Sequence, residues 1–151
     1  LHTNSAIGAI PRLLDIGVLP DIMAGNIIGI VAQRLVRRLC MHCKTPYQAE
    51  AHEAMLLGGN ADSARPVIFR PCGCERCGFQ GYRGRLAIME IMRLNADIDE
   101  LIARRSTARE IRQMAEQQGF VTLADDGLRR VLDGSTSLEE LGRVVDLTGK
   151  M

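Results

Sequence analysis

This sequence has few aromatic side chains and little net charge. Aromatic residues make up 3% of the 151 residues and tryptophan is absent, which disfavours a base-stacking surface for nucleic acid and predicts an aliphatic core. The formal net charge is only +1, so the overall balance indicates neither a nucleic-acid partner nor a membrane surface. No apolar run approaches the roughly 20 residues that would span a bilayer.

The start of the sequence carries no targeting signal. Leu1–Ser5 has neither the basic region nor the apolar region of a signal peptide, and there is no initiator methionine. With 46% hydrophobic residues, the chain can bury the core of one domain or of two small ones. We therefore expect an intracellular domain that has been cut from a longer polypeptide.

Cysteine, in contrast, is frequent, and four of the five cysteines form two regularly spaced pairs. Two C-x-x-C pairs, Cys40–Cys43 and Cys74–Cys77, place two thiolates on each of two tight turns, which together supply the four soft ligands of a tetrahedral structural site. A disulfide pair and a redox C-x-x-C are the alternatives. We interpret Cys72 as a neighbour of the site and His42 as an exposed loop residue. The spacing predicts Zn²⁺ bound by Cys40, Cys43, Cys74 and Cys77.

The remaining patterns predict an α/β chain that is mostly α. Helical spacing and β-branched runs mark the elements. The expected helices are 6–16, 20–28, 49–57, 97–105, 107–118, 122–133 and 137–146, and the expected strands are 30–39, 67–69 and 86–92. Capping boxes are expected at Asp97, Thr107 and Ser137, and Gly119 and Gly134 fall where helices should end.

The sequence lacks the phosphate loop of nucleotide hydrolases. The pattern G-x-x-x-x-G-K-[ST] does not occur, so the backbone cradle and the lysine that hold the phosphates are missing. No acidic Walker B strand precedes His2 either. We therefore expect no ATP hydrolysis by this chain alone.

Several segments nevertheless resemble the secretion ATPases of the type II secretion and type IV pilus systems. In chain order they are Leu1–Ala6, Ala32–Cys40, Gly81–Arg85, Thr122–Gly127 and Thr136–Glu140. The resemblance covers essentially the whole chain. It implies the C-terminal part of a RecA-like P-loop ATPase, with the end of the core at 1–39, a tetracysteine zinc-binding subdomain at 40–85 and a C-terminal helical subdomain at 86–151.

The resemblance also implies a function. It implies a hexameric, cytoplasmic motor, peripheral to the inner membrane, that uses ATP and Mg²⁺ to drive secretion or pilus assembly through an inner-membrane platform and cytoplasmic components. His2 would belong to the histidine box near the nucleotide phosphates, the zinc would be structural, and no nucleic acid is expected. The alternative is a free-standing zinc-binding interaction module, with Arg83, Arg85 and the Arg34–Arg38 face contacting nucleic acid.

Overall fold

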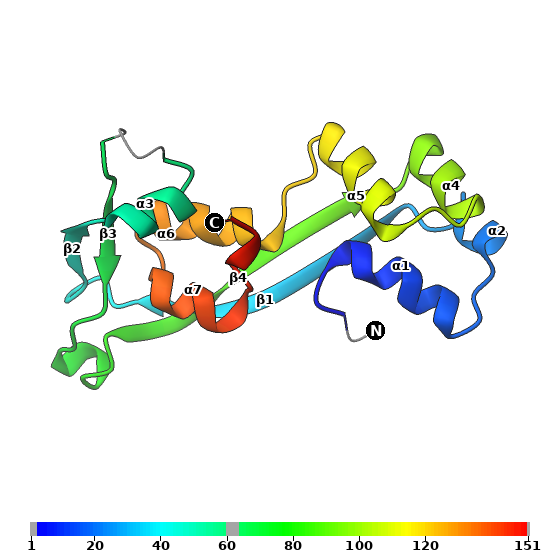
Figure 1. Cartoon of the computed structure of the whole chain (residues 1–151). Coiled ribbons are helices and arrows are strands. Elements are labelled where there is room, and N and C mark those ends of the chain that lie inside the picture. The colour runs from blue at the N-terminus through cyan, green and yellow to red at the C-terminus, as the bar shows by residue number, and fades with distance from the viewer. Residues whose placement is uncertain (1–2, 60–63, 151) are drawn as a thin grey trace. The chain divides into compact units, whose positions relative to one another are not determined.

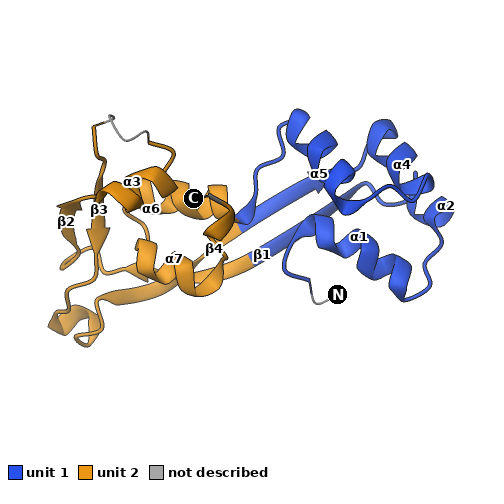
Figure 2. Ribbon diagram, in the orientation of Figure 1, with its two compact units in different colours: residues 1–33, 89–123 blue, residues 34–88, 124–151 orange. Residues whose placement is uncertain are grey.

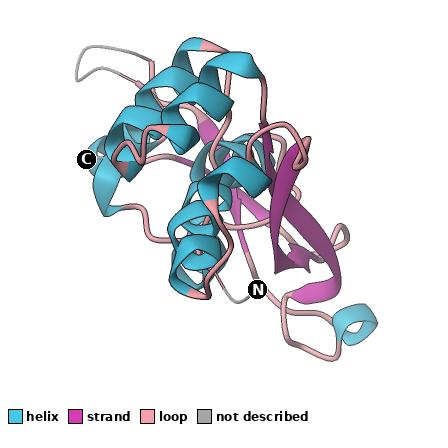
Figure 3. Ribbon diagram, turned by 90° about the vertical axis from the view of Figure 1, so that its right-hand side faces the viewer, coloured by secondary structure: helices cyan, strands magenta, loops and turns pink. Residues whose placement is uncertain are grey.

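The computed structural model describes residues 3–59 and 64–150, which form a mixture of helices and strands, as the sequence predicts (Figures 1 and 3). The strands are β1 (Gly29–Leu39), β2 (Thr45–Gln48), β3 (Val67–Arg70) and β4 (Tyr82–Arg93). The α-helices are α1 (Ala6–Asp15), α2 (Pro20–Met23), α3 (Ala51–Leu56), α4 (Ala96–Ala103), α5 (Ala108–Gln117), α6 (Leu123–Leu132) and α7 (Leu138–Val144). Among these described helices, none combines the length and the apolarity that crossing a membrane requires.

The chain divides into two compact units (Figure 2). Unit 1 comprises residues 1–33 and 89–123, and unit 2 comprises residues 34–88 and 124–151. Strands β1 and β4 pair with each other, and each strand passes from one unit into the other. The division into 1–39, 40–85 and 86–151 follows other boundaries and stays a prediction.

In unit 1, helix α1 begins where the sequence predicts. Ser5 is its N-cap, and the Ser5 hydroxyl accepts a hydrogen bond from Gly8 N at 3.0 Å. The helix continues through Pro11 and buries an apolar stripe on one face. The buried residues of this stripe are Ala6, Ile7, Ala9 and Ile10.

Two expectations about helix ends in unit 1 are wrong. Helix α2 is a single turn and does not extend to residue 28, because Gly25 takes a φ of +76° that a continuing helix does not allow. Helix α4 is capped by Asn95, whose Oδ1 accepts from Ile98 N at 3.1 Å, and not by Asp97. The Asp97 carboxylate instead accepts a hydrogen bond from the Gln118 side chain at 3.0 Å.

The other two expected capping boxes have different outcomes. At Thr107 the box is complete, since Thr107 N donates to Glu110 Oε2 at 2.7 Å and Glu110 N donates to the Thr107 hydroxyl at 3.3 Å. At α7 only half of it forms. Ser137 accepts from Glu140 N at 3.1 Å, but the Glu140 carboxylate bonds to Arg37.

Unit 2 contains a small antiparallel sheet that the sequence patterns predict only in part. Strand β3 agrees with the strand predicted at 67–69, whereas no strand is predicted at the position of its partner β2, which contains Pro46. Thr45 pairs with Arg70 and Gln48 with Val67. The core of unit 2 is aliphatic, as the scarcity of aromatic residues predicts, and its fully buried side chains include Val36, Leu39, Ile68, Ile88, Val131 and Leu141.

Helices α6 and α7 approach closely at Gly127. A Cβ built at Gly127 would lie 2.2 Å from Leu141 Cδ1, and Leu141 is completely buried. Gly142 on α7 is a matched control, because a Cβ there would meet nothing within 4 Å.

Gly127→Ala should therefore destabilise the protein, whereas Gly142→Ala should stabilise it. We expect Gly127→Ala to lower the free energy of unfolding by about 1–3 kcal/mol through overpacking. Gly142→Ala should raise it by about 0.5–1 kcal/mol, because alanine loses less backbone entropy in a helix. Urea unfolding measures both values, and a Gly127→Ala protein as stable as wild type would contradict the close helix contact.

Candidate metal centre

Each cysteine pair lies on a tight backbone turn in unit 2. In the first turn, Cys43 N and Lys44 N donate to Cys40 O at 3.3 and 3.0 Å. In the second, Cys77 N and Phe79 N donate to Cys74 O at 3.1 and 2.9 Å. Gly78 closes the second turn with a φ of +60°, in the left-handed region that glycine adopts at little cost.

The two turns bring four sulfur atoms together. The Sγ atoms of the four paired cysteines all lie within 4.8 Å of one another. The distances are 3.9 Å between Cys40 and Cys74, and 3.8 Å from Cys77 to both Cys43 and Cys74. A tetrahedral ion with metal–sulfur bonds of 2.3 Å has sulfur–sulfur edges of about 3.8 Å. The cluster has the size of such a shell and could hold a metal ion.

Backbone amides donate to two of these sulfurs. Cys77 Sγ accepts from Cys74 N and from Gly81 N, each at 3.2 Å, and Cys43 Sγ accepts from Gly73 N at 3.3 Å. The amide donors, that of Cys74 foremost, lower the pKa of the Cys77 thiol to about 6. Burial raises the pKa of the Cys43 thiol to about 12. Amide donors stabilise the thiolate, which is the form that binds metal.

The two residues that we excluded as ligands lie outside the cluster. Cys72 is exposed and is not one of the four grouped sulfurs. His42 is exposed as well, and both of its ring nitrogens lie 3.0–3.1 Å from Arg76 Nη1. All five cysteines are free, and the 3.8–3.9 Å separations exceed the roughly 2.05 Å of a disulfide, so the disulfide alternative is not what the structure contains.

The turn between α6 and α7 contacts the chain on both sides of the first cysteine pair. Lys44 Nζ donates to Gly134 O at 2.9 Å and lies 4.2 Å from the centre of the Phe69 ring. Leu39 N donates to Ser135 O at 2.9 Å. The cysteine turn and the turn that leads into α7 are therefore held together by direct bonds.

An ion pair within unit 2 joins β1 to α7. Arg37 Nε and Nη2 donate to Glu140 Oε2 at 2.9 and 2.7 Å, and Arg37 N donates to Glu140 Oε1 at 3.0 Å. The guanidinium lies 4.2 Å above the Tyr82 ring, and the Tyr82 hydroxyl is 2.6 Å from that of Ser137. Sequence reasoning treated Arg37 as part of an exposed basic face, because its partner lies 103 residues away.

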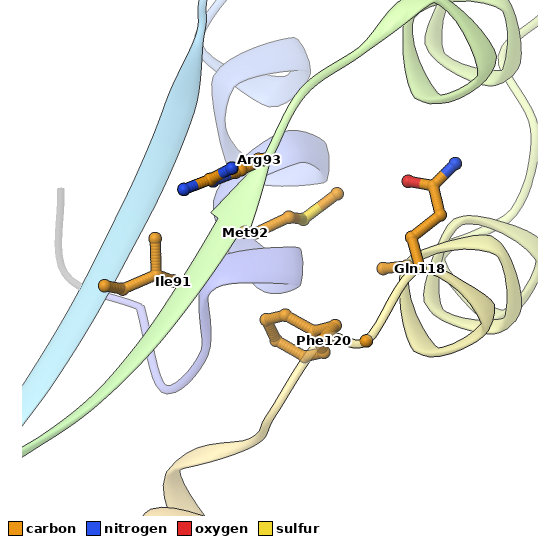
Figure 4. Close-up of a pocket in the computed structure, with 7 residues that line it drawn as sticks. Ile91, Met92, Arg93, Gln118 and Phe120 are labelled. Carbon is orange, nitrogen blue, oxygen red and sulfur yellow. The ribbon is translucent and has the colours of Figure 1, made fainter.

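Unit 1 contains a pocket, but its side chains suit no catalytic role. The pocket has a volume of about 310 Å³ beside β4 and the end of α5 (Figure 4). Its lining is mostly apolar and includes Ile91, Met92 and Phe120, and Arg93 is its one charged residue. The Gln118 amide at its edge already bonds to Asn95 and Asp97. His2, the other predicted site residue, lies outside the described residues.

The fold and the four-sulfur cluster define a class: an α/β chain with a tetracysteine centre that could hold a metal ion. Residues 1–143 match the family model of the type II/IV secretion system proteins. The chain belongs to this family, and the resemblance drawn from its motifs is confirmed.

Curated relatives carry secretion and pilus names. The chain is 44% identical over 95% of its length to type II secretion system protein E of Pseudomonas aeruginosa. It is 40% identical over 98% of its length to the type IV pilus assembly ATPase TfpB of Acinetobacter baylyi, and 42% identical over 95% to the type II secretion system ATPase E of Vibrio cholerae. It spans 28%, 26% and 28% of these three relatives, about a quarter of their length.

Elemental analysis should separate the ligands from the neighbouring thiol. Cys74→Ser removes one of the four sulfur ligands, so we expect metal content to fall from about one ion per chain to well below half. Cys72→Ser is the control and should keep the metal, because Cys72 lies outside the cluster. Equal metal content in both variants would mean that Cys74 is not a ligand.

Glu140→Gln should destabilise the protein at neutral pH and have less effect in acid. Burial favours a higher pKa for Glu140, but the Arg37 bonds outweigh it and hold the pKa below the usual 4.5. The carboxylate therefore contributes stability above its unfolded pKa and loses it as the pH falls through the lower folded pKa.

We expect Glu140→Gln to lower the free energy of unfolding by about 1–3 kcal/mol at neutral pH. The gap to wild type should narrow as the pH falls through the folded pKa of Glu140. Glu139→Gln, at an exposed position on the same helix, should differ little from wild type. Urea unfolding across pH measures both, and a gap that does not change with pH would argue against a stabilised carboxylate.

Proposed function

We propose that this chain is the C-terminal region of the motor ATPase that powers type II protein secretion or type IV pilus assembly. The observation that carries the proposal is the family match over residues 1–143, together with relatives that are named secretion and pilus ATPases. In this proposal, residues 1–39 end a RecA-like core, 40–85 form the metal-binding subdomain and 86–151 form the helical subdomain.

The metal in this proposal is zinc, and its role is structural. Four thiolates from Cys40, Cys43, Cys74 and Cys77 would complete a tetrahedral shell and leave no position for a water or a substrate. Glu75, although adjacent in sequence, would then have no metal-bound water to activate. The bonds from Lys44 and Leu39 to the 134–135 turn support a role in fixing the helical region against the cysteine turns.

Membership of this family also suggests an oligomeric state, a nucleotide and a cellular location for the whole protein. We propose that the whole protein is a homo-hexamer that binds ATP and Mg²⁺, with His2 near the nucleotide phosphates. It would act in the cytoplasm, peripheral to the inner membrane, on a platform protein and other cytoplasmic components of the machine, and not on nucleic acid. The names of the secretion and pilus relatives support this setting.

A turnover assay with Mg²⁺ and ATP tests the proposal. The full-length protein should hydrolyse ATP, whereas the isolated 151-residue chain should not, because it contains no phosphate loop to position the phosphates. Hydrolysis by the isolated chain that survives further purification would contradict this. A full-length protein without turnover would favour the alternative, a zinc-binding interaction module.

The structural role of the metal is tested in the same full-length protein. The double variant Cys74→Ser, Cys77→Ser should lower the melting temperature and the turnover number, with the KM for ATP unchanged, because the proposal gives the metal a structural role and no part in binding ATP. Cys72→Ser is the matched control. Unchanged melting and turnover in the double variant would make the metal dispensable.

A further inference from the structure

Glu90 is a buried carboxylate on β4 that bonds to the starts of two helices. It is 3% exposed. Its Oε1 accepts a hydrogen bond from Ala6 N, the first residue of α1, and its Oε2 accepts one from Leu123 N, the first residue of α6, at 2.9 Å. All three residues belong to unit 1. The amide groups at helix starts carry partial positive charge, so they compensate the buried carboxylate as a cation would.

These bonds differ from ordinary helix capping. Helix α1 already has a local cap in Ser5, so Glu90 supplies a second acceptor from 84 residues away. Its bond to Leu123 spans 33 residues in the other direction. A local cap fixes one helix only, whereas one carboxylate shared between two helices fixes their starts relative to each other.

Only a carboxylate can make both bonds. Each of its two oxygens is an acceptor, whereas a glutamine has one acceptor oxygen and an NH₂ group that would face the other amide N–H. Glu90→Gln therefore preserves the shape of the side chain but must release one of the two helix starts.

We propose that Glu90 is a positioning residue that couples the start of α1 to the start of α6. The consequence for activity rests on the proposed function. In the sequence, α1 comes directly after the segment that contains His2, and α6 leads to the 134–135 turn that bonds to Lys44 and Leu39. In this proposal, a shift of the start of α1 is carried through Glu90 to the start of α6.

Hydrogen–deuterium exchange of the full-length protein tests the coupling. In Glu90→Gln, amides at the start of α1, of α6 or of both should exchange roughly tenfold faster, the size expected for the loss of a bond to a charged acceptor. Glu110→Gln is the matched control, because Glu110 caps only its own helix, α5, and should leave both starts unchanged. Wild-type exchange at both helix starts in Glu90→Gln would overturn the inference.

ATP turnover separates positioning from simple structural support. If Glu90 positions the nucleotide end, Glu90→Gln should lower kcat at least about threefold and leave the KM for ATP unchanged. Faster exchange with an unchanged kcat, or a loss confined to melting temperature, would overturn the positioning role and leave the proposed function standing. Wild-type protein without turnover would instead refute the proposed function, and the exchange data would still decide whether Glu90 couples the two helices.

Discussion

Four sulfur atoms from the two ends of a long loop lie within 4.8 Å of one another. The two cysteine turns are 34 residues apart, and the elements described between them, β2, α3 and β3, are short. Such short elements bury little apolar surface by themselves, so a metal ion bound by the four sulfurs would have a large share in ordering them. The contacts of Lys44 and Leu39 with the 134–135 turn depend in turn on where the first cysteine turn lies.

Three charged side chains, Arg37, Glu90 and Glu140, form hydrogen bonds between segments that are distant in the sequence. Arg37 and Glu140 join β1 to α7, and Glu90 joins the starts of α1 and α6. The two carboxylates, Glu90 and Glu140, are buried; a paired buried charge adds little net stability over apolar groups, but leaving it unpaired is costly. We therefore infer that these interactions contribute more to the specificity of the arrangement than to the net free energy of unfolding.

The sequence predicted the features whose physical cause is local. The turn of each cysteine pair, the Ser5 cap, the Thr107 box and the strand beginning near Ile30 each depend on residues a few positions apart. The same patterns failed where a tertiary contact decides the outcome. Asn95 caps α4 in place of Asp97, whose carboxylate bonds to Gln118, and β2 forms despite Pro46 because β3 pairs with it.

Long-range polar contacts were beyond what the sequence patterns could show. Within the run from Ile88 to Met92, Glu90 has the position of a polar residue in a strand, and nothing in its neighbours indicates that two helix starts converge on it. The partner of Arg37 was equally hidden, because Glu140 has the spacing of a capping-box residue and its carboxylate is used elsewhere.

The half-formed cap of α7 has a consequence for how the protein folds. Helix α7 has seven residues, fewer than the roughly 12–15 that an isolated helix needs in water. The Glu140 carboxylate bonds to Arg37 on β1, so it does not complete the capping box that would stabilise the start of α7. We therefore expect α7 to become stably helical only once it contacts β1.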